Sequence, residues 1–205
     1  QGFVFESHGD YQGESSATII EGITISNSYY NGSGNYYGGG VYINNASPTF
    51  NNCIIRDNHL RTTGCETWVV GAGVYANNSS SIFTDCQILN NKLTSHRSNC
   101  WNYGRGAGVV VEGGGSVSLL NCIVADNIIN KDERYMRLYG SGIATWNAEL
   151  IIENTEISRN GLYNNYNGDY VPQGAGIWRD GGGTTTMTTV IVAYYTRAPR
   201  VSRHN

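Results

Sequence analysis

The stretch Gly71-Ala72-Gly73-Val74-Tyr75, with Phe83-Thr84-Asp85-Cys86-Gln87-Ile88 and then Asn91 after it, decides the fold because it recurs five times. In each copy a large apolar residue follows the second glycine after ten or eleven positions, and a small residue comes three later. In the first four copies an asparagine follows after five more. The second glycines lie 33, 35, 34 and 34 residues apart, at Gly40, Gly73, Gly108, Gly142 and Gly176. A repeat of this length predicts a solenoid, a propeller or an array.

The apolar residues inside each copy have the spacing of short strands. The step from Phe83 to Cys86 is three, which marks a corner, and the step from Cys86 to Ile88 is two, which is the period of a strand. The Gly-x-Gly suits a tight bend with a positive φ. The closing asparagine marks another corner, since asparagine tolerates a left-handed backbone. No stretch has the 3.6-residue period that ankyrin or tetratricopeptide repeats require.

These spacings predict an all-β chain that forms a single-stranded, right-handed parallel β-helix of about six coils, each of 33–35 residues. One loop in each coil varies in length, and the rest of the coil is nearly constant. We expect 1–205 to be a single domain, with clear repeats over 18–195 and a C-terminal tail over 196–205.

The Gly-Gly/Ala-Gly-apolar motif, followed by segments such as Phe50-Asn51-Asn52-Cys53, resembles the repeats of bacterial surface proteins with a parallel β-helix. The pattern is similar to that of polymorphic outer membrane proteins, within the pectate-lyase-like superfold, and the resemblance covers roughly 18–195. The chain departs from that family where Cys53, Cys86 and Cys122 stand at the position of the family's asparagine. The resemblance implies the fold and says little about function.

Several side chains are expected to meet between neighbouring coils. The core cysteines Cys53, Cys86 and Cys122 share one position of the repeat, and we interpret them as small buried apolar residues. The closing asparagines should form a ladder of amide hydrogen bonds, and they are Asn58, Asn91, Asn127 and Asn160.

The other two cysteines lie in the variable loops of adjacent coils. Because coils stack about 4.8 Å apart, we predict a disulfide between Cys65 and Cys100, which would indicate an oxidising, extracellular setting. The sequence has no Cys-x-x-Cys pair, so we expect no metal site and no cofactor.

Composition narrows the classes of partner. Charged residues make up 14% of the chain and the net charge is −3, which disfavours nucleic acid as a partner. No run of 18 apolar residues exists, so no membrane span is expected. The chain begins at Gln1 with neither a Met nor a visible signal peptide, as a processed or excised segment would. Asn-x-Ser sequences, either glycosylation sites or chance matches, occur at Asn31, Asn45, Asn77 and Asn78.

Aromatic residues gather in the segments expected to be variable loops. They are Tyr36, Tyr37, Trp68, Trp101, Tyr103, Tyr135, Tyr139, Tyr163, Tyr166 and Tyr170. If these loops emerge at one corner of the solenoid, the rings form a continuous face for binding or self-association. In the alternative interpretation, the rings only cover one another's loops.

Parallel β-helices include polysaccharide lyases and hydrolases, which need clustered carboxylates. The candidates Asp57, Asp126, Glu153 and Glu156 are scattered over rung and corner positions, and Asn90 stands between the first two. We therefore assign no catalytic residue, and a lyase or hydrolase fragment is the least favoured interpretation.

The favoured hypothesis is a non-enzymatic structural protein of the cell surface or extracellular space. It would be a filament subunit or adhesin stalk that stacks coils end to end, with copies of itself or surface components as partners. The β-prone run near the C-terminus would make the joint, through Val190, Val192, Tyr194 and Tyr195. The alternative is a carbohydrate-binding module that uses the tyrosine- and tryptophan-rich face.

Overall fold

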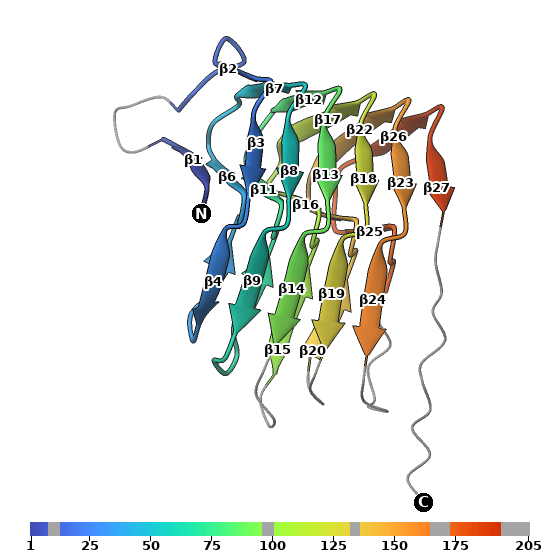
Figure 1. The fold of residues 1–205 in the computed structure, drawn as a ribbon. Coiled ribbons are helices and arrows are strands. Elements are labelled where there is room, and N and C mark those ends of the chain that lie inside the picture. The colour runs from blue at the N-terminus through green and yellow to red at the C-terminus, as the bar shows by residue number, and fades with distance from the viewer. Residues whose placement is uncertain (8–12, 96–100, 132–135, 165–172, 194–205) are drawn as a thin grey trace, which may run out of the picture.

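A computed structural model describes residues 1–7, 13–95, 101–131, 136–164 and 173–193. These residues form 27 short strands and no helix. The strands belong to five sheets that run along the stacking direction of the coils (Figure 1). We name the sheets A to E in the order in which the chain visits them within one coil.

Sheets A, B and C each contain six strands. Sheet A consists of β1 (Phe3–Glu6), β6 (Val41–Asn44), β11 (Val74–Asn77), β16 (Val109–Glu112), β21 (Ile143–Trp146) and β25 (Ile177–Asp180). Sheet B consists of β2 (Ile19–Glu21), β7 (Thr49–Asn51), β12 (Ile82–Thr84), β17 (Ser116–Leu120), β22 (Glu149–Glu153) and β26 (Thr185–Thr188). Sheet C consists of β3 (Thr24–Ser26), β8 (Ile54–Arg56), β13 (Gln87–Leu89), β18 (Ile123–Ala125), β23 (Glu156–Ser158) and β27 (Ile191–Ala193).

Sheets D and E contain five and four strands. Sheet D consists of β4 (Tyr29–Gly32), β9 (His59–Thr62), β14 (Lys92–Ser95), β19 (Ile128–Lys131) and β24 (Gly161–Asn164). Sheet E consists of β5 (Tyr36–Tyr37), β10 (Trp68–Val70), β15 (Asn102–Arg105) and β20 (Met136–Tyr139).

Every strand pair is parallel, and the repeat sets the register. Val74 pairs with Val41 on one side and Val109 on the other, so equivalent residues of successive coils lie side by side. The predicted all-β parallel solenoid is confirmed. It makes about five turns rather than six, because the described part of the last coil contributes strands only to sheets A, B and C.

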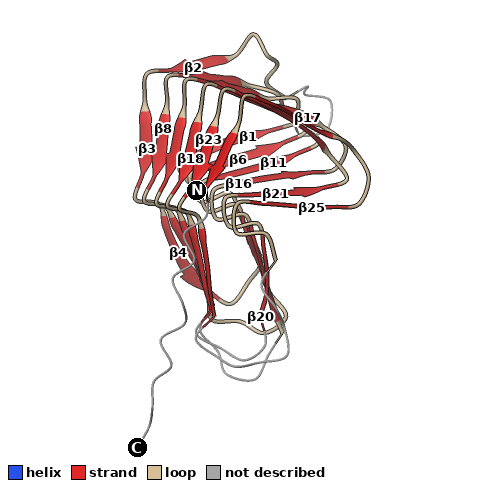
Figure 2. Cartoon of the chain, turned by 90° about the vertical axis from the view of Figure 1, so that its right-hand side faces the viewer, coloured by secondary structure: helices blue, strands red, loops and turns tan. Residues whose placement is uncertain are grey.

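The stacked coils enclose two separate apolar cores, one in each of the two lobes that the backbone outlines in Figure 2. Sheets A, B and C surround the larger one, the triangular core, which includes the stacked rings of Phe50 and Phe83, 4.7 Å apart. Sheets D and E surround the smaller one, the lobe core, which includes Leu93 and Ile129. Along strands such as β17 and β20, buried residues alternate with less buried ones, as a two-residue period requires, and the buried ones fill the cores.

A polar waist separates the two cores, and the closing asparagines build it. The side-chain amide and the backbone N–H of Asn91 both donate to Oδ1 of Asn127, each at 3.0 Å. The amide of Asn127 also donates to the carbonyl of Ile88 at 2.9 Å. Asn91 and Asn127 are fully buried, so these bonds satisfy backbone groups that water cannot reach.

The second glycine of each motif closes the waist from the opposite side. A Cβ added to Gly73 would lie 2.9 Å from Nδ2 of Asn91 and 2.5 Å from the carbonyl oxygen of Gly108. Only glycine leaves room for the asparagine there. The first glycine makes the predicted bend, since Gly71 has a φ of 64°.

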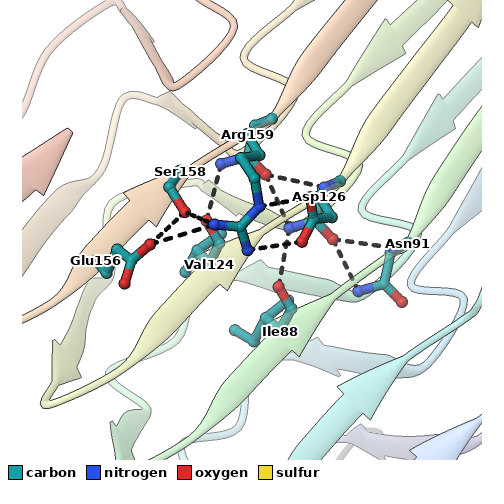
Figure 3. Close-up of polar contacts among 9 residues, drawn as sticks. Ile88, Asn91, Val124, Asp126, Glu156, Ser158 and Arg159 are labelled. Atoms are coloured by element: carbon teal, nitrogen blue, oxygen red, sulfur yellow. Dashed lines mark hydrogen bonds and ion pairs between the residues drawn. The ribbon is translucent and has the colours of Figure 1, made fainter. Parts of the chain in front are cut away.

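The prediction that the closing asparagine takes the left-handed turn is wrong. The residue before it does so, with φ of 53° at Asn90, 58° at Asp126 and 52° at Arg159. The asparagine must direct its amide inward to bond the next coil, so the preceding residue absorbs the turn with its side chain outside. Figure 3 shows two of these outer residues joined: the guanidinium of Arg159 donates to both carboxylate oxygens of Asp126, at 2.9 and 2.8 Å.

The core cysteines form a buried row of free thiols in the triangular core. Cys53, Cys86 and Cys122 are at most 1% exposed. Each sulfur contacts a carbonyl of the preceding coil, as Cys86 Sγ does with the oxygen of Phe50 at 3.5 Å. Thr155 continues the row, and its hydroxyl donates to the carbonyl of Leu119 at 3.2 Å. In the four coils that contain these residues, the position therefore holds a small side chain with a hydrogen-bond donor.

Candidate functional site

The outward faces of sheets A and E meet at a re-entrant angle that aromatic side chains fill. We call this surface the aromatic corner. Its packed centre consists of Val70, Tyr75, Val110 and Ala144, all buried, with Tyr37, Tyr42, Trp68 and Trp178 packed against them. Each strand of sheet E ends just before a Gly-x-Gly bend and the next strand of sheet A begins just after it, so the bend fixes the angle between the two sheets.

Arg105 is the central charge of the aromatic corner. It comes from β15, and only 12% of its side chain is exposed. Its guanidinium carbon lies near four ring centroids: Trp68 (4.6 Å), Trp146 (4.7 Å), Trp178 (5.6 Å) and Tyr139 (5.9 Å). Ring faces attract a cation at such distances, and more strongly where water is excluded.

Glu112 of β16 completes this arrangement. Nη1 of Arg105 donates to its Oε1 at 3.0 Å, and the hydroxyl of Tyr75 donates to its Oε2 at 3.1 Å. Burial, followed by the charge of Glu112, raises the pKa of Tyr75. The same two causes raise the pKa of Tyr37. Both phenols therefore stay neutral, and the corner combines neutral hydroxyls, ring faces and one ion pair.

The rings stack along the solenoid as well as across it. Trp68 and Tyr103, neighbours in sheet E, stack with centroids 4.1 Å apart. Tyr139 and Trp178 meet across the angle between sheets E and A at 4.5 Å. Trp68, Tyr103 and Trp178 each remain partly exposed, so the corner presents ring surface to solvent.

The prediction that these aromatic residues lie in loops is wrong for most of those described. Tyr37, Trp68, Tyr103 and Tyr139 lie on strands of sheet E, which the sequence did not suggest. These strands can form because each pairs with its counterpart in the next coil, although the residues differ in type.

The other predicted members of the face do not all join it. Tyr36 is on sheet E but stacks with Tyr30 at 3.2 Å against the lobe core, and Tyr163 lies on sheet D. Trp101 lies just before β15, where the guanidinium of Arg137 is 5.5 Å from its ring. The residues outside the described ranges are Tyr135, Tyr166 and Tyr170.

Sequence reasoning missed the half of the corner that sheet A supplies. Tyr42, Tyr75 and Trp178 occupy one outward row of this sheet, and Glu112 and Trp146 occupy the next. All of them lie on the strand that follows the Gly-x-Gly motif. Reading alternate positions of that strand as an outward row would have found them.

The Asn-x-Ser positions lie on the outer surface of the first coils. Asn31 is exposed on β4, and Asn45 and Asn78 share the turn between sheets A and B. The amide of Asn78 donates to Oδ1 of Asn45 at 3.1 Å, and that of Asn77 donates to Asn44 at 2.8 Å. The amide nitrogens of Asn77 and Asn78 are thus engaged between coils. Their glycosylation stays a prediction.

Cys65 lies between β9 and β10, and its predicted disulfide partner Cys100 is outside the described residues. The disulfide therefore stays a prediction.

The carboxylates considered for catalysis remain apart or in ion pairs. Asp57 lies 3.7 Å from Arg56, and Asp126 is held by Arg159. Glu156 lies 3.6 Å from the same arginine, whereas Glu153 is exposed on β22. Within the described ranges, no three His, Cys, Asp or Glu side chains form a group that could hold a metal.

The predicted joint is only partly described. Val190 packs against the triangular core, Val192 is 36% exposed on β27, and Tyr194 and Tyr195 lie outside the described residues.

Comparison with protein-family profiles, curated proteins and solved structures finds no match for this chain. Among the residues that the structure describes, no helix is long and apolar enough to cross a membrane.

Proposed function

We propose that the protein is a non-enzymatic scaffold of the cell surface or extracellular space, an adhesin-like stalk that binds a glycan at the aromatic corner. The observation that carries this proposal is the set of partly exposed rings held on two sheets of fixed register. Trp68, Trp146 and Trp178 reach the corner from strands rather than loops, so no loop has to be ordered when a ligand binds.

The chemistry of the corner suits a sugar. The C–H faces of a pyranose ring pack on indole and phenol rings, while its hydroxyls need donors and acceptors nearby. Arg105 and Glu112 supply both, and they already neutralise one another, which favours a neutral ligand over a strongly charged one.

A glycan array, followed by titration calorimetry with the best glycan, tests the proposal. We expect Trp178→Ala to weaken binding about tenfold, the equivalent of roughly 1.4 kcal/mol. Tyr29→Ala is the matched control, because Tyr29 is 60% exposed on sheet D, outside the corner. An array without binding, or equal losses in the two variants, would contradict the proposal.

A filament subunit is the second candidate, and exposed core positions at both ends favour it. Phe3 at one end and Met187 at the other occupy inward rows, yet they are 41% and 53% exposed. Covering such residues is the usual driving force for stacking. Light scattering and negative-stain imaging over a range of concentrations test this candidate, and a monomer at all concentrations would exclude it.

The extracellular location is tested separately. Peptide mapping of the non-reduced protein should recover Cys65 and Cys100 in one linked peptide. Recovery of both as free thiols from protein exported to an oxidising compartment would contradict the predicted disulfide.

A further inference from the structure

The last described coil breaks the pattern of the triangular core at one position. In sheet A, an inward row runs through Ile43, Ala76, Val111, Thr145 and Arg179. The first four are at most 1% exposed, whereas Arg179 is exposed at the edge of the sheet. An arginine therefore stands at a position of this row where all the other described coils have a small or apolar residue.

The register shows what a second copy would meet at this edge. If its first coil continued the same ladders, its Ile20 would lie beside Met187 in sheet B, and its Ile25 beside Val192 in sheet C. Both pairs are apolar, so these two sheets favour stacking.

Sheet A opposes it. Continuing its ladders would place Phe5 of the second copy beside Arg179, and Glu6 beside Asp180. The first contact would bury the guanidinium in the apolar triangular core, away from water, and the second would bring two carboxylates together. Unpaired buried charge is among the most costly arrangements in a protein.

We propose that Arg179 is a gatekeeper that prevents the C-terminal edge of the solenoid from stacking on the N-terminal edge of a second copy. An inward-pointing charge is a known way to protect the edge of a sheet, because solvation of that charge is lost as soon as another strand docks. The exposed apolar residues of sheets B and C need such protection. The inference does not depend on glycan binding, and it opposes the filament candidate.

Replacing the charge tests the gatekeeper. We expect the purified wild-type chain to be monomeric in sedimentation velocity. Arg179→Val should associate into head-to-tail oligomers at concentrations at least about tenfold below any at which the wild type associates. Arg56→Val is the matched control. Arg56 lies on an outward row of sheet C with 52% of its side chain exposed, so the Arg56→Val variant should stay monomeric.

A second substitution identifies the surface that associates. Adding Ile20→Arg to Arg179→Val places a new charge on the opposite edge, at the partly exposed position that would meet Met187, and it should restore the monomer. Far-UV circular dichroism verifies that each variant is folded. A folded Arg179→Val that stays monomeric would overturn the inference, and so would wild-type filaments or equal association of the Arg56 control. Glycan affinity measured on the same samples reports on the proposed function independently.

Discussion

The triangular core and the lobe core are built by the same coils, yet they differ in the kinds of side chain that fill them. Among the described residues, 24 apolar residues form the triangular core and eight form the lobe core. The triangular core stacks similar residues in register, as Phe50 and Phe83 show. The lobe completes its interior with polar groups: Thr67 donates to Asn102 at 3.0 Å, and Asn102 donates to Ser95 at 2.9 Å.

This difference shows that the repeat of the sequence belongs to the triangular core and the waist. The glycines and the closing asparagines recur because each coil needs them at the same place, whereas the lobe tolerates changes in length and residue type. A buried polar network is stable only when each member finds a partner. We therefore expect the waist and the triangular core to determine global stability, and the lobe to contribute less.

The largest effect should come from the waist that joins the two cores. Asn127→Ala would leave the backbone N–H of Asn91 buried without its acceptor, and it would remove one hydrogen bond each from the side-chain amide of Asn91 and the carbonyl of Ile88. Each such group costs about 1–3 kcal/mol, so we expect a loss of about 3–5 kcal/mol in the free energy of unfolding, measured by urea denaturation. Asn51→Ala, at a partly exposed outward position of β7, is the control and should change it by about 0.5 kcal/mol or less. Equal losses would mean that the ladder adds nothing specific.

The second effect compares the cores directly through one substitution. Leu119 and Leu93 are both fully buried, in the triangular core and the lobe core respectively. Leu119→Ala should cost about 4 kcal/mol and Leu93→Ala about 2–3 kcal/mol, because the smaller lobe can collapse further around the cavity. Urea denaturation of the two variants gives both values. A larger loss at Leu93 would reverse the order of importance that we assign to the cores.

A third effect concerns the contact of the lobe with sheet A. Arg105→Ala would remove the cation among the rings and leave the partly buried Glu112 without its ion pair, at a cost of about 1–2 kcal/mol. Arg159→Ala breaks the exposed ion pair with Asp126 and should cost about 0.5 kcal/mol. Thermal denaturation of the two variants measures both losses of stability. A loss in Arg105→Ala no larger than that in Arg159→Ala would show that the ring cluster does not strengthen the ion pair of Arg105.

The recurrent glycine motif was enough to predict the parallel solenoid, its coil length and the residues of the triangular core. It could not reveal sheet E, because the residues at equivalent positions of this sheet differ in type from coil to coil, as Trp68, Tyr103 and Arg137 do. Their pairing comes from the backbone, which parallel coils bring into register whatever the side chains are.

The aromatic corner was only half predictable for a related reason. Its two halves lie on different sheets, and the angle between them depends on the bend at the first glycine. The left-handed residue was misplaced by one position, since the sequence shows that Asn127 recurs but not that its amide points inward.

The smallest effect is a pH dependence confined to the lobe. Burial, together with the charges of Lys92 and Arg61, lowers the pKa of His59 to about 4 from 6.5. The folded protein therefore binds the proton less well than the unfolded chain, so this contribution to stability is complete above pH 6.5 and is lost as the pH falls toward 4. Because the ring is only about half buried, we expect about 1 kcal/mol from it.

His59→Gln isolates this contribution, because glutamine is neutral throughout and can still bond to Thr94, which lies 2.7 Å from Nε2 of the histidine. The free energy of unfolding, measured by urea denaturation at pH 7 and pH 4.5, should fall by about 1 kcal/mol more in the wild type than in the variant. Because the carboxylates titrate in both proteins, their contribution to the pH dependence of stability cancels in the difference. Parallel pH curves would show that water reaches the ring in the folded lobe. The lobe would then be looser than its packing indicates, and its contrast with the triangular core would be sharper.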